Sequence, residues 1–172
     1  MYHNIQQDEL FDALDSYHSE KKGVNWMTRK YFDTMKATSE DPRTNFRLHC
    51  VGLYGGPIGD ASAAPLLAGE IGYSIGKIYT SLTGFVLEAD TGHLQLACLG
   101  IWLERCGYSF WSMGHCYSPE LDYKRTLGHQ VYPRGDFLKK LKQHRGNFEQ
   151  PRGGENHFVG LEDGSEFDFK WV

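Results

Sequence analysis

The chain has 172 residues, of which 40% are hydrophobic and 14% aromatic, enough for one domain with its own core and too apolar for a disordered chain. The formal net charge of −4 argues against a general nucleic-acid-binding protein. No apolar run reaches membrane length, and the N-terminus has no signal-peptide pattern. The four cysteines follow neither disulfide-framework nor zinc-ligand spacing. We therefore expect a soluble cytoplasmic protein with no metal, no cofactor and no attachment to a membrane.

Two helices are predicted in the N-terminal region. Residues 6–19 place apolar side chains at helical spacing and acids in the first turn, and Gly23 is expected to end that helix. Thr28 is a typical cap for a second helix. Residues 39–45 are polar and contain a proline, which predicts a loop.

Three antiparallel strands and a buried helix are expected next. Residues 47–54 alternate as a strand does, and residues 66–75 and 77–85 predict a hairpin that turns near Ser74–Gly76. Residues 93–105 predict a helix with almost no polar face, which must be covered on most sides. Asp90 or Thr91 is its expected cap, and Gly107 its left-handed end.

The C-terminal part alternates strands and helices. Residues 108–113 predict a central strand, and Ser118-Pro119 opens a helix that Gly128 stops. Residues 129–132 predict a short strand. Residues 134–145 predict a basic amphipathic helix, and its expected inward side chains are Phe137, Leu138 and Leu141.

The expected fold class is α/β (α+β), with a mixed, mainly antiparallel sheet and flanking helices. Residues 1–172 form one domain in this interpretation: 1–45 hold N-terminal helices, 46–145 the sheet and helix core, and 146–172 a tail with a possible strand at 157–161.

Basic residues are concentrated in one segment. Residues 121–152 hold eight Lys or Arg against three acids, whereas residues 1–20 hold five acids and no Lys or Arg. Two explanations stand: an ordinary solvated helix face, or a local anion-binding surface such as an RNA phosphate track. The candidates for RNA binding are Lys139, Lys140, Lys142 and Arg145.

Several pieces, in order, resemble the leucyl/phenylalanyl-tRNA–protein transferases and their eukaryotic-type relatives. Residues 23–28 are similar to the family's Gly-x-x-Trp-Ile/Leu-Thr turn, and residues 68–85 to its glycine-rich hairpin. Residues 94–110, and 127–138 with Leu127-Gly128 and Pro133-Arg134, complete the match, which spans roughly residues 5–142. The resemblance implies a domain like the GCN5-related N-acetyltransferases.

The resemblance also implies an activity: transfer of a Leu- or Phe-like amino acid from aminoacyl-tRNA to the N-terminal amine of a protein, as a degradation tag. It implies no metal, an apolar pocket for the aminoacyl side chain, and stacking on the 3′ adenosine. The implied partners are aminoacyl-tRNA and a protein or peptide N-terminus; the oligomeric state stays open.

Substrate-binding candidates follow from this activity. Trp26, between a glycine turn and a helix cap, offers an aromatic face for stacking, or is a packing residue. Ser81 and Thr83 are expected on one strand face, able to bond a carbonyl or ribose, or to be satisfied hydroxyls. The same face is expected to be made apolar by Tyr79 and Phe85; Ser112, in the following strand, joins the candidates.

His115, after the predicted central strand, is the catalytic candidate, because an imidazole accepts a proton from an amine near neutral pH. The alternative is a loop histidine with no role. A nucleophilic pair with Cys116 is disfavoured, since neighbours in an extended chain point apart.

Two other functions stay open. The family's Gly-Glu-Ser-Met-Phe corresponds to residues 80–85, which lack the glutamate, and its Asp-x-Gln pair is absent from residues 111–115. This favours a non-catalytic descendant that binds a peptide or RNA end. An acyl-CoA-dependent N-acyltransferase is the weaker alternative, because residues 86–92 contain one glycine and two acids, which repel a pyrophosphate.

Overall fold

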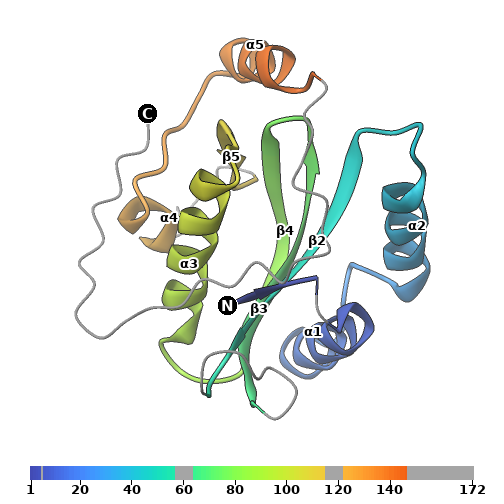
Figure 1. Cartoon of the computed structure of the whole chain (residues 1–172). Coiled ribbons are helices and arrows are strands. Elements are labelled where there is room, and N and C mark those ends of the chain that lie inside the picture. Colours follow the sequence, from blue (N-terminus) through green and yellow to red (C-terminus); the bar gives the residue numbers. More distant parts are fainter. Residues whose placement is uncertain (5, 57–63, 115–121, 147–172) are drawn as a thin grey trace.

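The computed structural model of the chain describes residues 1–4, 6–56, 64–114 and 122–146 (Figure 1). The elements in chain order are β1 Tyr2–His3, α1 Gln7–Lys22, α2 Arg29–Glu40, β2 Phe46–Tyr54, β3 Leu66–Ile75, β4 Ile78–Val86, α3 Thr91–Arg105, β5 Phe110–Ser112, α4 Asp122–Thr126 and α5 Arg134–His144.

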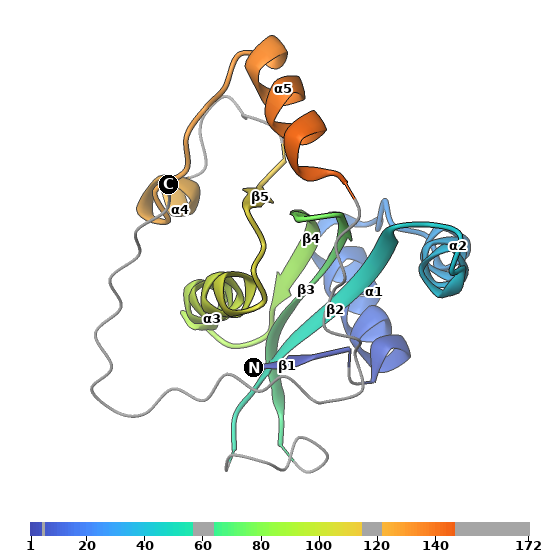
Figure 2. The same ribbon diagram turned by 45° about the horizontal axis from the view of Figure 1, so that its top comes forward.

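The strands form one mixed sheet in the order β1-β2-β3-β4-β5. β1 to β4 pair antiparallel, and β5 runs parallel to β4. Helices α1 and α2 lie on one side of this sheet and α3 on the other (Figure 2). The predicted α+β class with a mainly antiparallel sheet and flanking helices is therefore confirmed.

Each face of the sheet has its own apolar core. The core against α1 and α2 contains Leu10, Phe11, Leu14, Met27, Phe32, Met35, Leu48, Cys50, Ile71 and Phe85. The core against α3 contains Met1, Val51, Leu53, Ala68, Tyr79, Cys98, Leu99, Trp102 and Leu103. Residues of β2 and β3 alternate between the two cores, as the period of two requires.

The predicted helix ends were largely correct. Thr28 Oγ1 accepts a hydrogen bond from the Tyr31 amide at 3.3 Å, and Gly23 ends α1 with φ of 75°. Gly107 also has φ of 75°. Asp90 precedes α3 without a side-chain cap, while the Thr91 hydroxyl donates back to the Glu88 carbonyl at 2.6 Å.

Several predictions about position were wrong. β5 lies at the edge of the described sheet, not at its centre, because α3 carries the chain past β4 and the antiparallel strands fill the other side. Residues 129–132 do not form a strand. Pro133 favours extended backbone in the residue before it, but this segment pairs with no strand of the sheet. The two-residue strand β1 was too short to predict.

Two helices are also more exposed than expected. Leu138 of α5 is 40% exposed and not inward, because α5 meets the rest of the fold mainly through its Phe137 face, which packs on Phe110. Leu94 of α3 is also exposed, since only the other side of that helix packs on the sheet. The predicted helix start at residues 118–119 and the strand at 157–161 lie outside the described residues.

A β-bulge divides β4 into two halves. Ile71 pairs with Thr83 but the next residue, Gly72, pairs with Ser81, so Leu82 is an extra residue in β4. The insertion breaks the alternation of side chains. Tyr79 and Ser81 therefore face α3, whereas Thr83 faces α1, where its hydroxyl lies 3.0 Å from His18 Nε2. The expectation that all four side chains share one face was therefore wrong: Tyr79 and Ser81 lie on one face, and Thr83 and Phe85 on the other.

Gly72 leaves the space in which the Tyr79 ring crosses β3. A Cβ at Gly72 would lie 2.6 Å from Cζ of Tyr79 and closer still to its hydroxyl oxygen. We expect Gly72→Ala to lower the free energy of unfolding by about 1–3 kcal/mol, because the ring has to leave its place. Urea denaturation checks this. Gly135→Ala in α5, where a Cβ meets nothing within 4 Å, is the control and should cost nothing.

Candidate active site

The side chain of Glu70 is buried between β3 and α3. It is only 3% exposed, and a carboxyl group is rarely buried so fully unless polar groups surround it. Its Oε1 accepts hydrogen bonds from the Tyr79 hydroxyl at 2.7 Å and the Ser81 hydroxyl at 2.8 Å. Both donors come from β4 before the bulge, which holds them on the face of Glu70.

Burial raises the pKa of the Glu70 carboxyl to about 7, although the hydrogen bonds from Tyr79 and Ser81 and the nearby Gln95 amide oppose the rise. An ordinary glutamate is ionised at neutral pH and accepts protons poorly. A carboxyl with a pKa near 7 gains and loses a proton at physiological pH, as a general acid–base catalyst must.

Ser81 connects this buried carboxyl to the outer part of the cluster. Its Oγ donates to Glu70 and accepts a hydrogen bond from Trp111 Nε1 at 2.9 Å. Ser81 is half-buried, whereas Glu70 and Tyr79 are buried. Because a hydroxyl oxygen has two lone pairs, Ser81 keeps one for a further donor.

Helix α3 contributes a polar group to the same interior. Gln95 is buried and lies close enough to Glu70 to lower the pKa of its carboxyl, yet Gln95 Nε2 has no well-formed hydrogen bond among the described residues. An orphaned donor beside a titrating carboxyl costs stability, so this cluster is not optimised for packing alone.

A second polar chain lies on the same face. His49 Nδ1 is 2.7 Å from His3 Nε2, and His49 Nε2 is 2.7 Å from Ser74 Oγ. Burial lowers the pKa of His49 well below its ordinary value, so its ring is neutral at pH 7. Neutral His49 contacts the Tyr79 ring and supports it from the side of β2.

A buried lysine lies at the end of β5. Lys124 of α4 is 5% exposed, and its Nζ donates to the carbonyl of Met113 at 2.6 Å. Thr80 and Ser112 form the last pair of the parallel strands, so Ser81 and Met113 are the first residues past it. The carboxyl ends of parallel strands are where ligands bind in many α/β folds.

The structure brings together only part of the predicted substrate site. Tyr79 and Ser81 meet at Glu70. Ser112 pairs with Thr80, so its buried side chain lies on the opposite face of the sheet from Ser81. Thr83 and Phe85 also lie on that opposite face. His115 and Cys116 lie outside the described residues.

Trp26 belongs to the connection between α1 and α2. Its indole is 54% exposed, so it is not a packing residue, and its ring centroid lies 6.0 Å from that of Tyr31. The following Met27 is buried in the core against α1 and α2. Trp26 therefore stays a candidate for stacking, but it is not placed on the Ser81 face.

The four predicted RNA-binding residues differ in their surroundings. Lys140 Nζ lies 4.8 Å from the centroid of the Tyr132 ring, and Lys139 forms a 3.0 Å ion pair with Asp136. Lys142 and Arg145 are exposed. The spacing of three and six residues puts Lys139 and Lys142 of α5, and Arg145 just after its end, on one side of the helix, away from Lys140.

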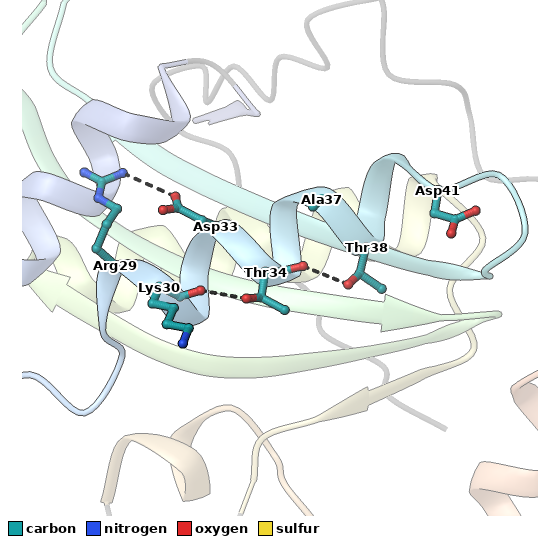
Figure 3. A pocket seen from close by; sticks show the side chains of 7 residues that line it. All are labelled: Arg29, Lys30, Asp33, Thr34, Ala37, Thr38 and Asp41. Carbon is teal, nitrogen blue, oxygen red and sulfur yellow. Dashed lines mark hydrogen bonds and ion pairs between the residues drawn. The ribbon is translucent and has the colours of Figure 1, made fainter.

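A shallow surface groove runs along the outer side of α2 (Figure 3). It is lined by Arg29, Lys30, Asp33, Thr34, Ala37, Thr38 and Asp41. Its hydroxyls are already used, since Thr34 and Thr38 donate to carbonyls one turn earlier. The groove is formed by one helix on the opposite side of the sheet from Glu70, and it contributes nothing to the cluster.

Sequence reasoning missed Glu70, Gln95, Trp111 and Lys124. One signal for Glu70 was available: it is the only charged residue in residues 66–76. A lone carboxylate in an apolar strand is either paired or functional. The sequence around Lys124 does not indicate that this lysine is buried, because only the tertiary structure places it against the end of β5.

Across the described ranges, no three His, Cys, Asp or Glu side chains converge as metal ligands. The helices in those ranges are all too short or too polar to cross a bilayer. No model of a known protein family matches the chain, and no curated protein is significantly similar to it.

Proposed function

We propose that the protein is an aminoacyltransferase that moves an amino acid from aminoacyl-tRNA to the N-terminal amine of a protein or peptide. The observation that carries the proposal is the Glu70 carboxyl, buried, with a pKa of about 7 and bonded to the half-buried Ser81 hydroxyl. The family resemblance supplies the substrate class. The order of helices, hairpin, helix and parallel strand supports a fold related to the GCN5-type acetyltransferases.

Transfer of an aminoacyl group to an amine requires the enzyme to position the ester and the amine and to provide a proton acceptor. An aminoacyl ester is already activated, and holding ester and amine in a reactive geometry supplies much of the rate. The attacking amine must lose a proton as the amide forms. An α-amino group has a pKa of about 7.7–8.0, so a carboxyl with a pKa near 7 is a suitable acceptor.

Ser81 relays that proton in our proposal. The amine nitrogen donates to the second lone pair of Ser81 Oγ, while Ser81 passes its own proton to Glu70. Trp111 holds the hydroxyl through the 2.9 Å bond from Nε1, which fixes the direction of transfer. The relay explains how a buried carboxyl takes part in a reaction that it does not touch.

The Glu70 cluster replaces the carboxylate that the family resemblance leads one to expect in β4. Residues 80–85 contain no acid, but β3 provides one that reaches the same strand face through Ser81. This favours a catalytic protein over a non-catalytic descendant. A neutral packing residue would stabilise that position better than a desolvated carboxyl.

The experiment is a transfer assay with the wild-type chain. Radiolabelled Leu-, Phe- and Met-tRNA are each supplied with a peptide that begins with Lys or Arg, and label in the peptide is expected. The same peptide with an acetylated N-terminus is the control and should gain none.

Unlabelled peptide beside intact aminoacyl-tRNA would contradict the proposal. Retention of the tRNA or the peptide without turnover would instead indicate a binding module. A thermal shift with CoA esters, and none with aminoacyl-tRNA, would indicate the acyl-CoA alternative.

A further inference from the structure

One polar group beside Glu70 takes no part in the proposed relay: the side-chain amide of Gln95. It lies on the inward face of α3, because the residues three, four and seven positions later pack in the core: Cys98, Leu99 and Trp102. Gln95 is only 3% exposed, and its Nε2 has no well-formed hydrogen bond among the described residues. A buried donor without an acceptor lowers stability, so its place beside a carboxyl has a reason other than packing.

The hydrogen bonds of Glu70 show which of its oxygens this amide can serve. Oε1 accepts from both Tyr79 and Ser81, which occupies the two lone pairs of that atom. Oε2 accepts no well-formed hydrogen bond from any residue that the structure describes. Gln95 is close enough to the carboxyl to lower its pKa, which is the effect of a donor that favours the ionised form. The acceptor left for Gln95 Nε2 is therefore Oε2.

We propose that Gln95 is a positioning residue that donates an Nε2 hydrogen to Oε2 of Glu70 and thereby keeps the transferred proton on Oε1, the oxygen bonded to Ser81. The inference rests on the proposed function and adds the group that directs its proton acceptor. A proton held on Oε2 could not return through Ser81. Donation to Oε2 makes that oxygen the poorer proton acceptor, in the same way that a hydrogen bond to one nitrogen fixes the tautomer of a catalytic imidazole.

The relay stays balanced in protons. As the amine nitrogen bonds to the ester carbon, its proton passes to Ser81 Oγ and the hydroxyl proton of Ser81 passes to Oε1. When the bond from carbon to the ribose oxygen breaks, that oxygen takes a proton from Ser81 Oγ, and Oε1 returns its own to Ser81. Gln95 keeps both amide protons throughout, and its hydrogen bond is strongest while Glu70 is ionised.

The titratable groups packed closest to this carboxyl keep one charge around pH 7. Burial raises the pKa of the Tyr79 and Tyr108 hydroxyls and of the Cys98 thiol on α3. It lowers the pKa of His49 on β2 well below its ordinary value. His3 of β1 lies behind the rings of His49 and Tyr79. A titration near pH 7 at the amide on α3 therefore reports the buried carboxyl.

NMR of the wild-type chain tests the hydrogen bond without any variant. The ¹³C resonance of the Glu70 carboxyl and the side-chain amide resonances of Gln95 are followed from pH 5 to pH 9. We expect one Gln95 Nε2 proton to move downfield as Glu70 ionises, with the same midpoint, because a charged acceptor makes a stronger hydrogen bond. The control is Asn25, whose amide donates to Asp15 and should not share this midpoint. A Gln95 amide that does not respond would overturn the inference.

Gln95→Met and Gln95→Leu test the direction of the effect. Each replaces the amide by an apolar side chain, which suits a site beside an apolar core. We expect the midpoint of the Glu70 carboxyl to rise by about one pH unit, because loss of a donor disfavours the ionised form. The transfer rate should then fall about tenfold at pH 6, where about a tenth as much carboxylate remains, and by less at pH 9. Gln143→Met, an exposed change on α5, is the matched control and should alter neither quantity.

The outcomes separate this inference from the proposed function. A lowered or unchanged midpoint in the Gln95 variants would overturn the inference, since a donor to the carboxylate must raise it when removed. A rate lowered by the same factor at pH 6 and pH 9 would mark a merely structural role and would also overturn it. The NMR titration needs no substrate. An inactive wild type would therefore overturn the proposed function, while the Glu70 midpoint still decides whether Gln95 holds the carboxyl.

Discussion

Glu70→Gln is expected to abolish most transfer activity while making the protein more stable. The amide keeps a carbonyl oxygen that accepts from Tyr79 and Ser81, so the hydrogen bonds of Glu70 survive. It cannot accept a proton near neutral pH. Loss of a general base typically lowers the rate about 10²–10⁴-fold, which single-turnover transfer at pH 7.5 measures.

The gain in stability follows from the direction of the pKa change. The folded-state pKa of about 7 lies above the ordinary value of 4.5, so between these pH values the folded chain holds a proton that the unfolded chain has released. The free energy of unfolding therefore falls as pH rises through this window, and the loss persists above it. The full difference corresponds to on the order of 3 kcal/mol.

Urea unfolding at pH 5 and pH 8 checks this. We expect Glu70→Gln to be close to wild type at pH 5 and more stable at pH 8, with a stability that no longer falls across this window. Glu104→Gln, an exposed change of the same type, is the control and should alter neither stability nor activity. A variant that retains wild-type transfer would show that the carboxyl is only structural.

Removing the three aligned basic residues of α5 is expected to weaken tRNA binding. Lys139, Lys142 and Arg145 lie on one side of a helix with no buried residue, so Ala replaces them without disturbing a core. Each phosphate contact contributes about 0.7–0.9 to the slope of log affinity against log salt. We expect the triple variant to lose about 2 from this slope and to bind tRNA roughly 10–100-fold more weakly at low salt.

Filter binding between 50 and 200 mM salt measures the effect. A triple variant of Lys30, Arg43 and Arg105, which are exposed and lie outside α5, has the same change of net charge and serves as the control. Equal salt slopes for the two variants would mean that α5 does not contact the phosphates, and that its charge is an ordinary solvated face.

The parts of the fold that could be predicted from the sequence are those determined by interactions between residues close together in the chain. Thr28 caps α2 and Gly23 ends α1 because these residue types satisfy the helix ends through their own neighbours. The hairpin of β3 and β4 was visible from its alternation. The edge position of β5 was not, since it depends on where α3 returns the chain.

The candidate site was predicted only in part, for a physical reason that centres on Leu82. One inserted residue in β4 reverses every later side chain, and nothing in the composition of residues 78–86 indicates it. Ser81 therefore stays a candidate site residue, but two of its expected neighbours, Thr83 and Phe85, lie on the other face. Glu70 was visible as a lone charge, but its contacts depend on the register that the bulge sets.

The pH dependence of the transfer rate tests the central claim most directly, namely that Glu70 accepts the amine's proton. The rate of wild type divided by that of Glu70→Gln removes the titration of the amine itself, which both proteins share. We predict a ratio that rises tenfold for each pH unit below about 7 and is constant above it, as the pKa of Glu70 requires. A ratio that does not change between pH 5.5 and 8.5 would contradict the account.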